Sequence, residues 1–104
     1  MQSDLPELRR RVSAAVFGNR AAAEVIGAIE QLTEAGEPSV TTRMVANTAG
    51  LGDSVVRPVM IRLEAAGVVQ AQARPNGPRS PLHYQVQRGE LWIALTALVK
   101  TLPH

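Results

Sequence analysis

Apolar residues recur every three or four positions through most of the first 66 residues, which is the spacing of one buried face on an amphipathic helix. This pattern predicts four successive helices, and glycines at positions 36, 50 and 67 supply their stops or turns. The expected helices cover about residues 5–17, 20–35, 42–49 and 54–66.

Polar residues mark where two of these helices begin. Thr41 or Thr42 can cap the third helix and Asp53 or Ser54 the fourth, because such side chains accept hydrogen bonds from the free N–H groups of a first turn. Pro58 lies inside the fourth helix and has no N–H. We therefore expect that helix to start irregularly or to bend there.

The pattern changes after Gly67, where strand-forming segments replace helical ones. Residues 68–73 and 82–86 are predicted strands, and the eight residues between them contain three prolines and an Asn-Gly pair, which favours an exposed hairpin loop. Ser39-Val40 is long enough only for an edge strand. A last helix over about residues 89–102 carries leucines at alternating steps of four and three residues.

The chain of 104 residues has the size of one domain, and residues 1–104 are expected to form a single unit. It contains no cysteine, so disulfides and thiolate metal ligands are excluded. No apolar run reaches the length of a membrane span, and Met1–Pro6 lacks the features of a secretion signal. A cytoplasmic protein without a membrane partner is expected.

Charge is distributed unevenly along the chain. Residues 21–51 hold four glutamates against Arg43, a net charge of −3, whereas residues 52–88 hold five arginines against two acidic residues, a net charge of +3. Ten of the eleven basic residues are arginine, which suits bidentate contacts to phosphate and guanine, although a GC-rich genome also favours arginine codons. The basic half is expected to face an anionic partner.

The spacing within residues 42–61 indicates a helix-turn-helix. Ala46 is small enough for two helices to cross closely, Gly50 tolerates positive φ in the turn, and Val56 and Val59 can pack the second helix on the first. Val45, Ala49 and Leu51 complete this small core. With the hairpin and the last helix, the expected class is mainly α (α+β), a winged helix-turn-helix with a helix-turn-helix over about 42–66 and a wing over about 68–87.

Three stretches resemble bacterial winged-helix transcriptional regulators of the ArsR and MarR type, with the ArsR-like layout the closer. They are Val16-Phe17-Gly18-Asn19-Arg20, Val45-Ala46-Asn47-Thr48-Ala49-Gly50-Leu51 and Arg62-Leu63-Glu64-Ala65-Ala66-Gly67-Val68-Val69. The resemblance implies a sequence-specific regulator of transcription that binds double-stranded DNA, with the fourth helix in the major groove and the wing at the minor groove.

Carried onto this sequence, the resemblance implies a set of DNA-contacting residues in three segments. Arg57 is the strongest base reader, suited to guanine O6 and N7, unless it pairs with Asp53 one turn earlier. The threonines can equally serve as caps, and the loop arginines can equally serve solubility. The full set is Thr41, Thr42, Arg43, Asp53, Ser54, Arg57, Pro58, Arg62, Arg74, Asn76 and Arg79.

The last helix is apolar on more than one side, and the first helix offers a matching stripe. In the resembling family the two terminal helices build a symmetric homodimer, which implies an inverted-repeat operator. The expected interface residues are Leu5, Leu8, Val12, Leu91, Trp92, Leu95, Leu98 and Leu102. The alternative is that the last helix folds back over its own core.

Other function classes find little support in the sequence. The cysteine and Asp/His metal motifs of ArsR-type sensors are missing, and the two histidines, His83 and His104, form no ligand set, so no metal or cofactor is expected. No catalytic arrangement is present, and three aromatic residues are too few for a single-strand stacking platform. No small-molecule effector is specified. The alternative is a winged-helix protein-interaction module without direct DNA binding.

Overall fold

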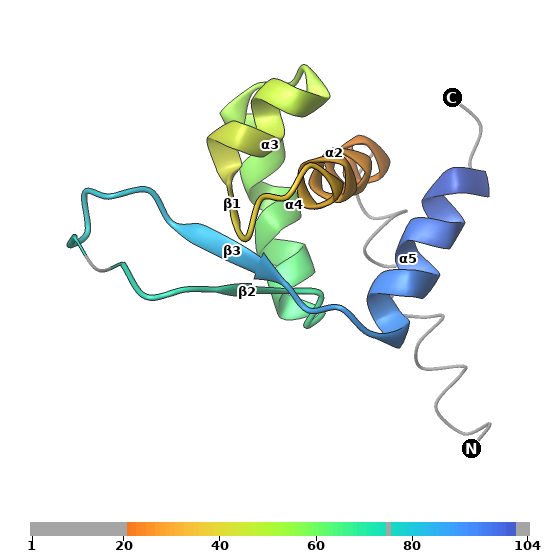
Figure 1. Cartoon of the computed structure of the whole chain (residues 1–104). Helices are drawn as coiled ribbons and strands as arrows, with labels where there is room; N and C mark the ends of the chain where they lie inside the picture. The colour runs from red at the N-terminus through yellow and green to blue at the C-terminus, as the bar shows by residue number, and fades with distance from the viewer. Residues whose placement is uncertain (1–20, 75, 102–104) are drawn as a thin grey trace.

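The computed structural model describes residues 21–74 and 76–101 (Figure 1). The helix predicted near the N-terminus, with Leu5, Leu8 and Val12, lies outside these residues, as does Leu102. The described elements are α2 (Ala22–Glu34), β1 (Val40–Thr41), α3 (Thr42–Ala49), α4 (Asp53–Ala65), β2 (Val69–Ala71), β3 (His83–Val86) and α5 (Glu90–Thr101). These residues form an α+β fold, which confirms the expected class at that level.

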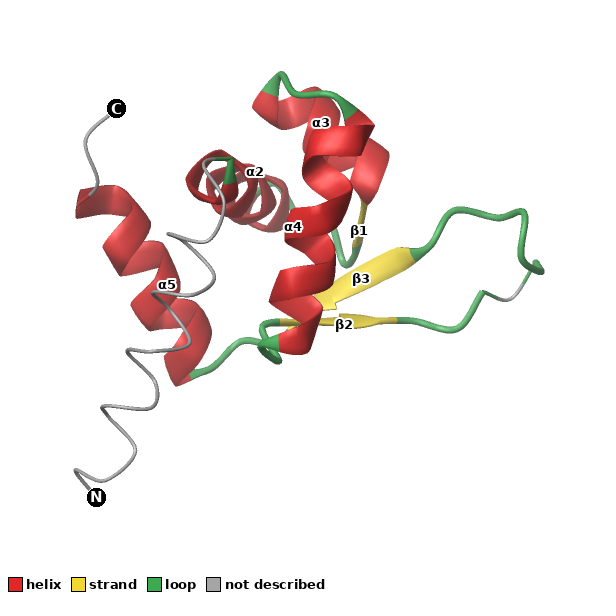
Figure 2. Ribbon diagram, turned by 180° about the vertical axis from the view of Figure 1, so that it is seen from behind, coloured by secondary structure: helices red, strands yellow, loops and turns green. Residues whose placement is uncertain are grey.

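The sheet has three antiparallel strands in the order β1-β3-β2. The expected hairpin of β2 and β3 is present, and the expected edge strand near Val40 adds β1 to the other side of β3, placing Val40 opposite Tyr84. On the other edge Val69 lies opposite Val86. The hairpin strands are shorter than predicted, and the long loop between them projects away from the helices, on the side remote from α5 (Figures 1 and 2).

The ends of α3 follow the predicted local chemistry. The Thr41 hydroxyl oxygen accepts a hydrogen bond from the Met44 amide at 3.1 Å, so Thr41 rather than Thr42 is the cap. Gly50 ends the helix with φ of 70°, a left-handed conformation that costs glycine nothing. The prediction of a close turn between two helices is confirmed at this residue.

The start of α4 differs from the prediction. Gly52 occupies the capping position and no side chain caps the first turn, so neither Asp53 nor Ser54 is the cap. Asp53 is instead the first helical residue, and its carboxylate lies 3.5 Å from the Arg43 guanidinium. The helix runs through Pro58 as one continuous element, so the proline does not divide it.

One apolar core joins the four described helices to the sheet. Ala46 is almost fully buried where α3 meets its neighbours, as its small size predicts, and Val56 and Val59 are fully buried on α4. The largest fully buried side chains are Ile26, Ile29, Met60, Leu63 and Leu95, together with valines from α2, α3, α4, β1 and the β2 segment. The core therefore fixes α4 against both α3 and the sheet.

The inner face of α5 belongs to this core. Leu95 is fully buried and Trp92 is 7 % exposed, because α5 packs against α2 (Figure 2). The Glu30–Lys100 ion pair at 3.7 Å also joins the two helices. The prediction that Trp92 and Leu95 belong to an exposed dimer seam is therefore wrong, and for these two residues the helix folds back over its own core. Leu91 and Leu98 are half-buried.

Replacement of Leu95 by alanine is expected to lower the free energy of unfolding by about 2–5 kcal/mol, because it leaves a cavity in the core. Ile93 is 66 % exposed on the same helix, so Ile93→Ala is expected to change stability by less than about 0.5 kcal/mol. Urea unfolding at several protein concentrations measures both. Equal effects of the two changes, or a Leu95→Ala effect that disappears at low protein concentration, would place Leu95 in an interface instead.

Candidate nucleic-acid interface

The solvent face of α4 is a continuous stripe opposite its buried residues. Positions 54, 58, 61 and 65 follow the spacing of one helix face, and all four are exposed. They are Ser54, Pro58, Ile61 and Ala65. Arg57 borders this stripe on one side and Arg62 on the other, and both are exposed. The face thus has a largely apolar centre between two cations.

The α3–α4 turn holds this face in a fixed position. The Leu51 amide donates a hydrogen bond of 2.9 Å to the Ala46 carbonyl across the Gly50 turn. Val45 and Ala46 are buried beneath the turn, and Ala49 and Leu51 pack against the same core. Because both helices are anchored, the first half of α4 is presented on a rigid support rather than on a loop.

A groove separates α4 from the sheet. Its volume is about 650 Å³, and the start of α3 also contributes to its lining. The residues that line it come from three segments of the chain: Thr41, Thr42, Arg43, Asp53, Arg57, Ile61, Glu64, Pro81, Leu82 and Tyr84. The fold therefore brings the start of α3, the side of α4 and the base of the hairpin loop together.

Charged residues around this groove influence the pKa of Tyr84. Its side chain is buried, and burial raises the pKa of its phenol above the ordinary value. The negative charge of Glu64 raises this pKa further, whereas the positive charges of Arg57 and Arg74 lower it. Both arginines thus lie close enough to influence one side chain.

The sequence offered an ion pair between Arg57 and Asp53, but the pair that forms beside the groove is a different one. Asp53 pairs with Arg43, ten residues earlier, and not with Arg57. Within residues 21–74 and 76–101, Arg57 makes no ion pair, and neither do Arg62 and Arg79. The guanidinium of Arg57 is therefore available to an external anion or base.

The hairpin loop has internal hydrogen bonds. The Arg74 guanidinium donates to the Pro78 carbonyl at 3.0 Å, and the Ser80 hydroxyl donates to the Gly77 carbonyl at 2.6 Å. Gly77 has φ of 89°, which the Asn-Gly pair anticipates. Asn76 and Arg79 are exposed near the tip. The loop thus presents the Arg79 side chain on a turn that these hydrogen bonds hold together.

The predicted contact residues are not equally accessible. Thr41 is 8 % exposed and its hydroxyl is used in capping, so its side chain is a structural element rather than a contact. Thr42 is half-buried, while Arg43 beside it is exposed. Asp53, which is negatively charged and paired with Arg43, does not suit a phosphate contact. The accessible set is Arg43, Ser54, Arg57, Pro58, Arg62, Arg74, Asn76 and Arg79.

Sequence reasoning missed two polar features of the sheet. The Ser39 hydroxyl and His83 Nδ1 form a hydrogen bond of 2.8 Å that ties the segment before β1 to β3. Four glutamines bond across the hairpin, through the pairs Gln72–Gln85 and Gln87–Gln70. The strand alternation that places these glutamines on one face was the available signal.

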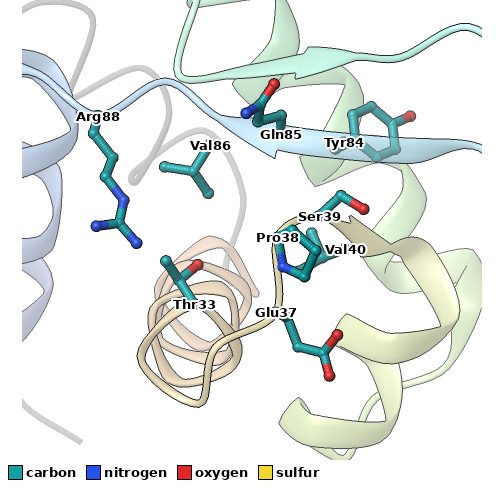
Figure 3. A pocket seen from close by; sticks show the side chains of 9 residues that line it. All are labelled: Thr33, Glu37, Pro38, Ser39, Val40, Tyr84, Gln85, Val86 and Arg88. Atoms are coloured by element: carbon teal, nitrogen blue, oxygen red, sulfur yellow. The ribbon is translucent and has the colours of Figure 1, made fainter.

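A second pocket of about 400 Å³ lies between the end of α2 and the sheet (Figure 3). Arg88 extends across it toward Thr33, whereas the Glu37 carboxylate points away from Arg88, toward α3. With one arginine and one glutamate at its lining, the pocket is electrically balanced. In the residues that the structure describes, no group of three potential metal ligands forms, and no helix combines the length and apolar character that a membrane crossing requires.

Comparison of the chain with protein-family models, with curated proteins and with solved structures gives no match in any of the three. The interpretation of the interface therefore depends on its residues and geometry.

Proposed function

We propose that the protein is a sequence-specific regulator of transcription that binds double-stranded DNA as a winged helix-turn-helix. In this proposal α3 and α4 form the helix-turn-helix, α4 enters the major groove, and the β2–β3 hairpin is the wing. The main support is the groove beside α4, which brings Arg57 of α4 together with Arg43 of α3 and with Pro81 and Leu82 at the base of the hairpin loop. A duplex that meets α4 would therefore also meet the wing.

The chemistry of the accessible residues suits three parts of a duplex. Arg57 can donate two hydrogen bonds to a guanine edge in the major groove. Arg43, at the start of α3, can exchange its exposed contact with Asp53 for a phosphate, at little cost because exposed ion pairs contribute little. Arg79 and Asn76, near the loop tip, can reach the adjacent minor groove.

The alternative of a protein-interaction module predicts a different surface. Such a module tends to present an acidic or apolar helix and wing, whereas here exposed arginines border the apolar stripe of α4 and lie in the hairpin loop. This difference favours nucleic acid as the partner.

The salt dependence of binding to random duplex DNA tests the proposal. Each phosphate neutralised by an arginine releases counterions, so the logarithm of the association constant should fall steeply with the logarithm of salt concentration. Absence of binding at low salt, or an affinity independent of salt, would contradict it. We also propose a two-fold homodimer through residues other than the buried Trp92 and Leu95, so selection of bound sequences should return inverted repeats with half-sites about one turn, roughly 34 Å, apart.

The double change Arg74→Ala and Arg79→Ala is expected to weaken duplex binding and to reduce the salt slope by up to about 1.8, since each lost phosphate contact removes about 0.9. Thermal stability should change little, because both side chains are exposed and only the bond to the Pro78 carbonyl is lost. Arg88→Ala is the matched control, since Arg88 is exposed but lies outside α4 and the loop. Parental affinity in the double variant would remove the wing from the interface.

A further inference from the structure

The solvent face of α4 carries apolar side chains that the proposed contacts do not use. Three large hydrophobic side chains are exposed in the described residues, and two of them, Val55 at 43 % and Ile61 at 56 %, lie on α4. Ile61 is in the central stripe beside Pro58, which is also exposed. Of the four stripe residues only Ser54 has a side chain that can form a hydrogen bond.

The stripe needs a partner that is apolar in the middle and anionic at its borders. Arg57 and Arg62 flank it on opposite sides, so an entirely apolar partner surface would remove water from two charges without replacing their hydrogen bonds. The major groove of DNA fits this pattern, because its walls are rows of phosphates while thymine places a C5-methyl group on its floor. Charge complementarity thus favours the duplex over a hydrophobic protein surface.

We infer that Ile61, assisted by Pro58, reads thymine through its C5-methyl group. This inference rests on the proposed function and extends it to the composition of the site. Arg57, at the border of the stripe nearer the sheet, reads an adjoining guanine, while the middle of the stripe packs on methyl groups. The preferred half-site therefore combines a guanine with one or more thymines within the few base pairs that one helix face covers.

Replacement of thymine by deoxyuridine tests this reading, because it removes the methyl group and leaves every hydrogen-bonding group of the base pair in place. The probes are the duplexes recovered by selection, with deoxyuridine introduced at one thymine of a half-site at a time. Removal of the contacted methyl should weaken binding by the parent protein about fourfold, the factor that corresponds to ~0.8 kcal/mol for one buried methylene-sized group.

The variant Ile61→Ala should bind the thymine and deoxyuridine duplexes almost equally, because the main side chain that contacts the methyl group is gone and only Pro58 remains. Ile93→Ala is the matched control: it truncates an isoleucine on α5 that is 66 % exposed, against 56 % for Ile61, and should keep the fourfold difference. The ratio of affinities for the two duplexes is independent of any loss of active protein. Circular dichroism melts establish that both variants are folded.

Two results separate this inference from the function on which it rests. A protein that binds no duplex contradicts the proposed function as a whole. A protein that binds its selected site tightly, yet is insensitive to deoxyuridine at every thymine, overturns the role of Ile61 alone. Retention of the fourfold difference in Ile61→Ala would likewise assign methyl recognition to another residue.

Discussion

Replacement of Arg57 by alanine is expected to weaken binding to the preferred duplex about five-fold to 150-fold, which corresponds to 1–3 kcal/mol, while binding to random DNA falls much less. The guanidinium is exposed and makes no ion pair with any residue of the described ranges, so no intramolecular partner has to be displaced. Titration of the selected duplex and of one with its guanine replaced measures the discrimination directly.

Two controls define what Arg57 contributes. Arg57→Lys keeps the charge but loses the planar pair of donors, so it should retain most of the random-DNA affinity and lose most of the discrimination. Arg88→Ala removes an exposed arginine elsewhere and should leave discrimination unchanged. If Arg57→Ala weakens every sequence by the same factor, Arg57 contacts phosphate and does not read a base.

Replacement of Pro58 by alanine is expected to raise the free energy of unfolding by about 1–3 kcal/mol. Pro58 lies in the interior of α4, where proline leaves the Ser54 carbonyl without its helical N–H donor and costs about 3 kcal/mol relative to alanine. The smaller flexibility of proline in the unfolded chain offsets part of this cost. A shift of the urea midpoint to higher concentration, with an unchanged slope, measures the gain.

The exposed Ser54 is the matched control for this substitution. Ser54→Ala lies on the same face of α4 and also increases helix propensity, but it restores no backbone hydrogen bond, so its effect should stay within about 0.5 kcal/mol. An unchanged or lower stability in Pro58→Ala would show that proline is at least as stable as alanine at this position. A gain in stability with a loss of site discrimination would indicate that the proline is kept for contact with DNA.

Local chemistry made much of the fold predictable from the sequence. The Thr41 hydroxyl caps α3, and Gly50 turns the chain, because each feature depends on residues within four positions. The buried faces of α2 and α4 follow from helical spacing in the same way. Of the predicted interface, Arg57 and the hairpin-loop cations are exposed, since a helix face and a proline-rich loop are both local properties.

The features that sequence reasoning missed depend on contacts between distant segments. Helical spacing groups Trp92 with Leu95 and Val99 but does not reveal that α2 covers them. Likewise, no local pattern predicts that Asp53 pairs with Arg43 across the turn, or that β1 pairs with β3, as in the pairing of Val40 with Tyr84. The spacing of apolar residues predicts which residues share a helix face, but only the packing of the folded chain determines which element covers that face.

The sheet also bears on how the protein behaves at high concentration. Its central strand is β3, so both edges are formed by strands of only two and three residues, β1 and β2. Such short edges offer few unpaired N–H and C=O groups to a neighbouring molecule, and the glutamines of the β2–β3 face bond to each other. Strand-to-strand aggregation therefore has little template among the described residues, and aggregation through these strand edges is expected only when the core unfolds.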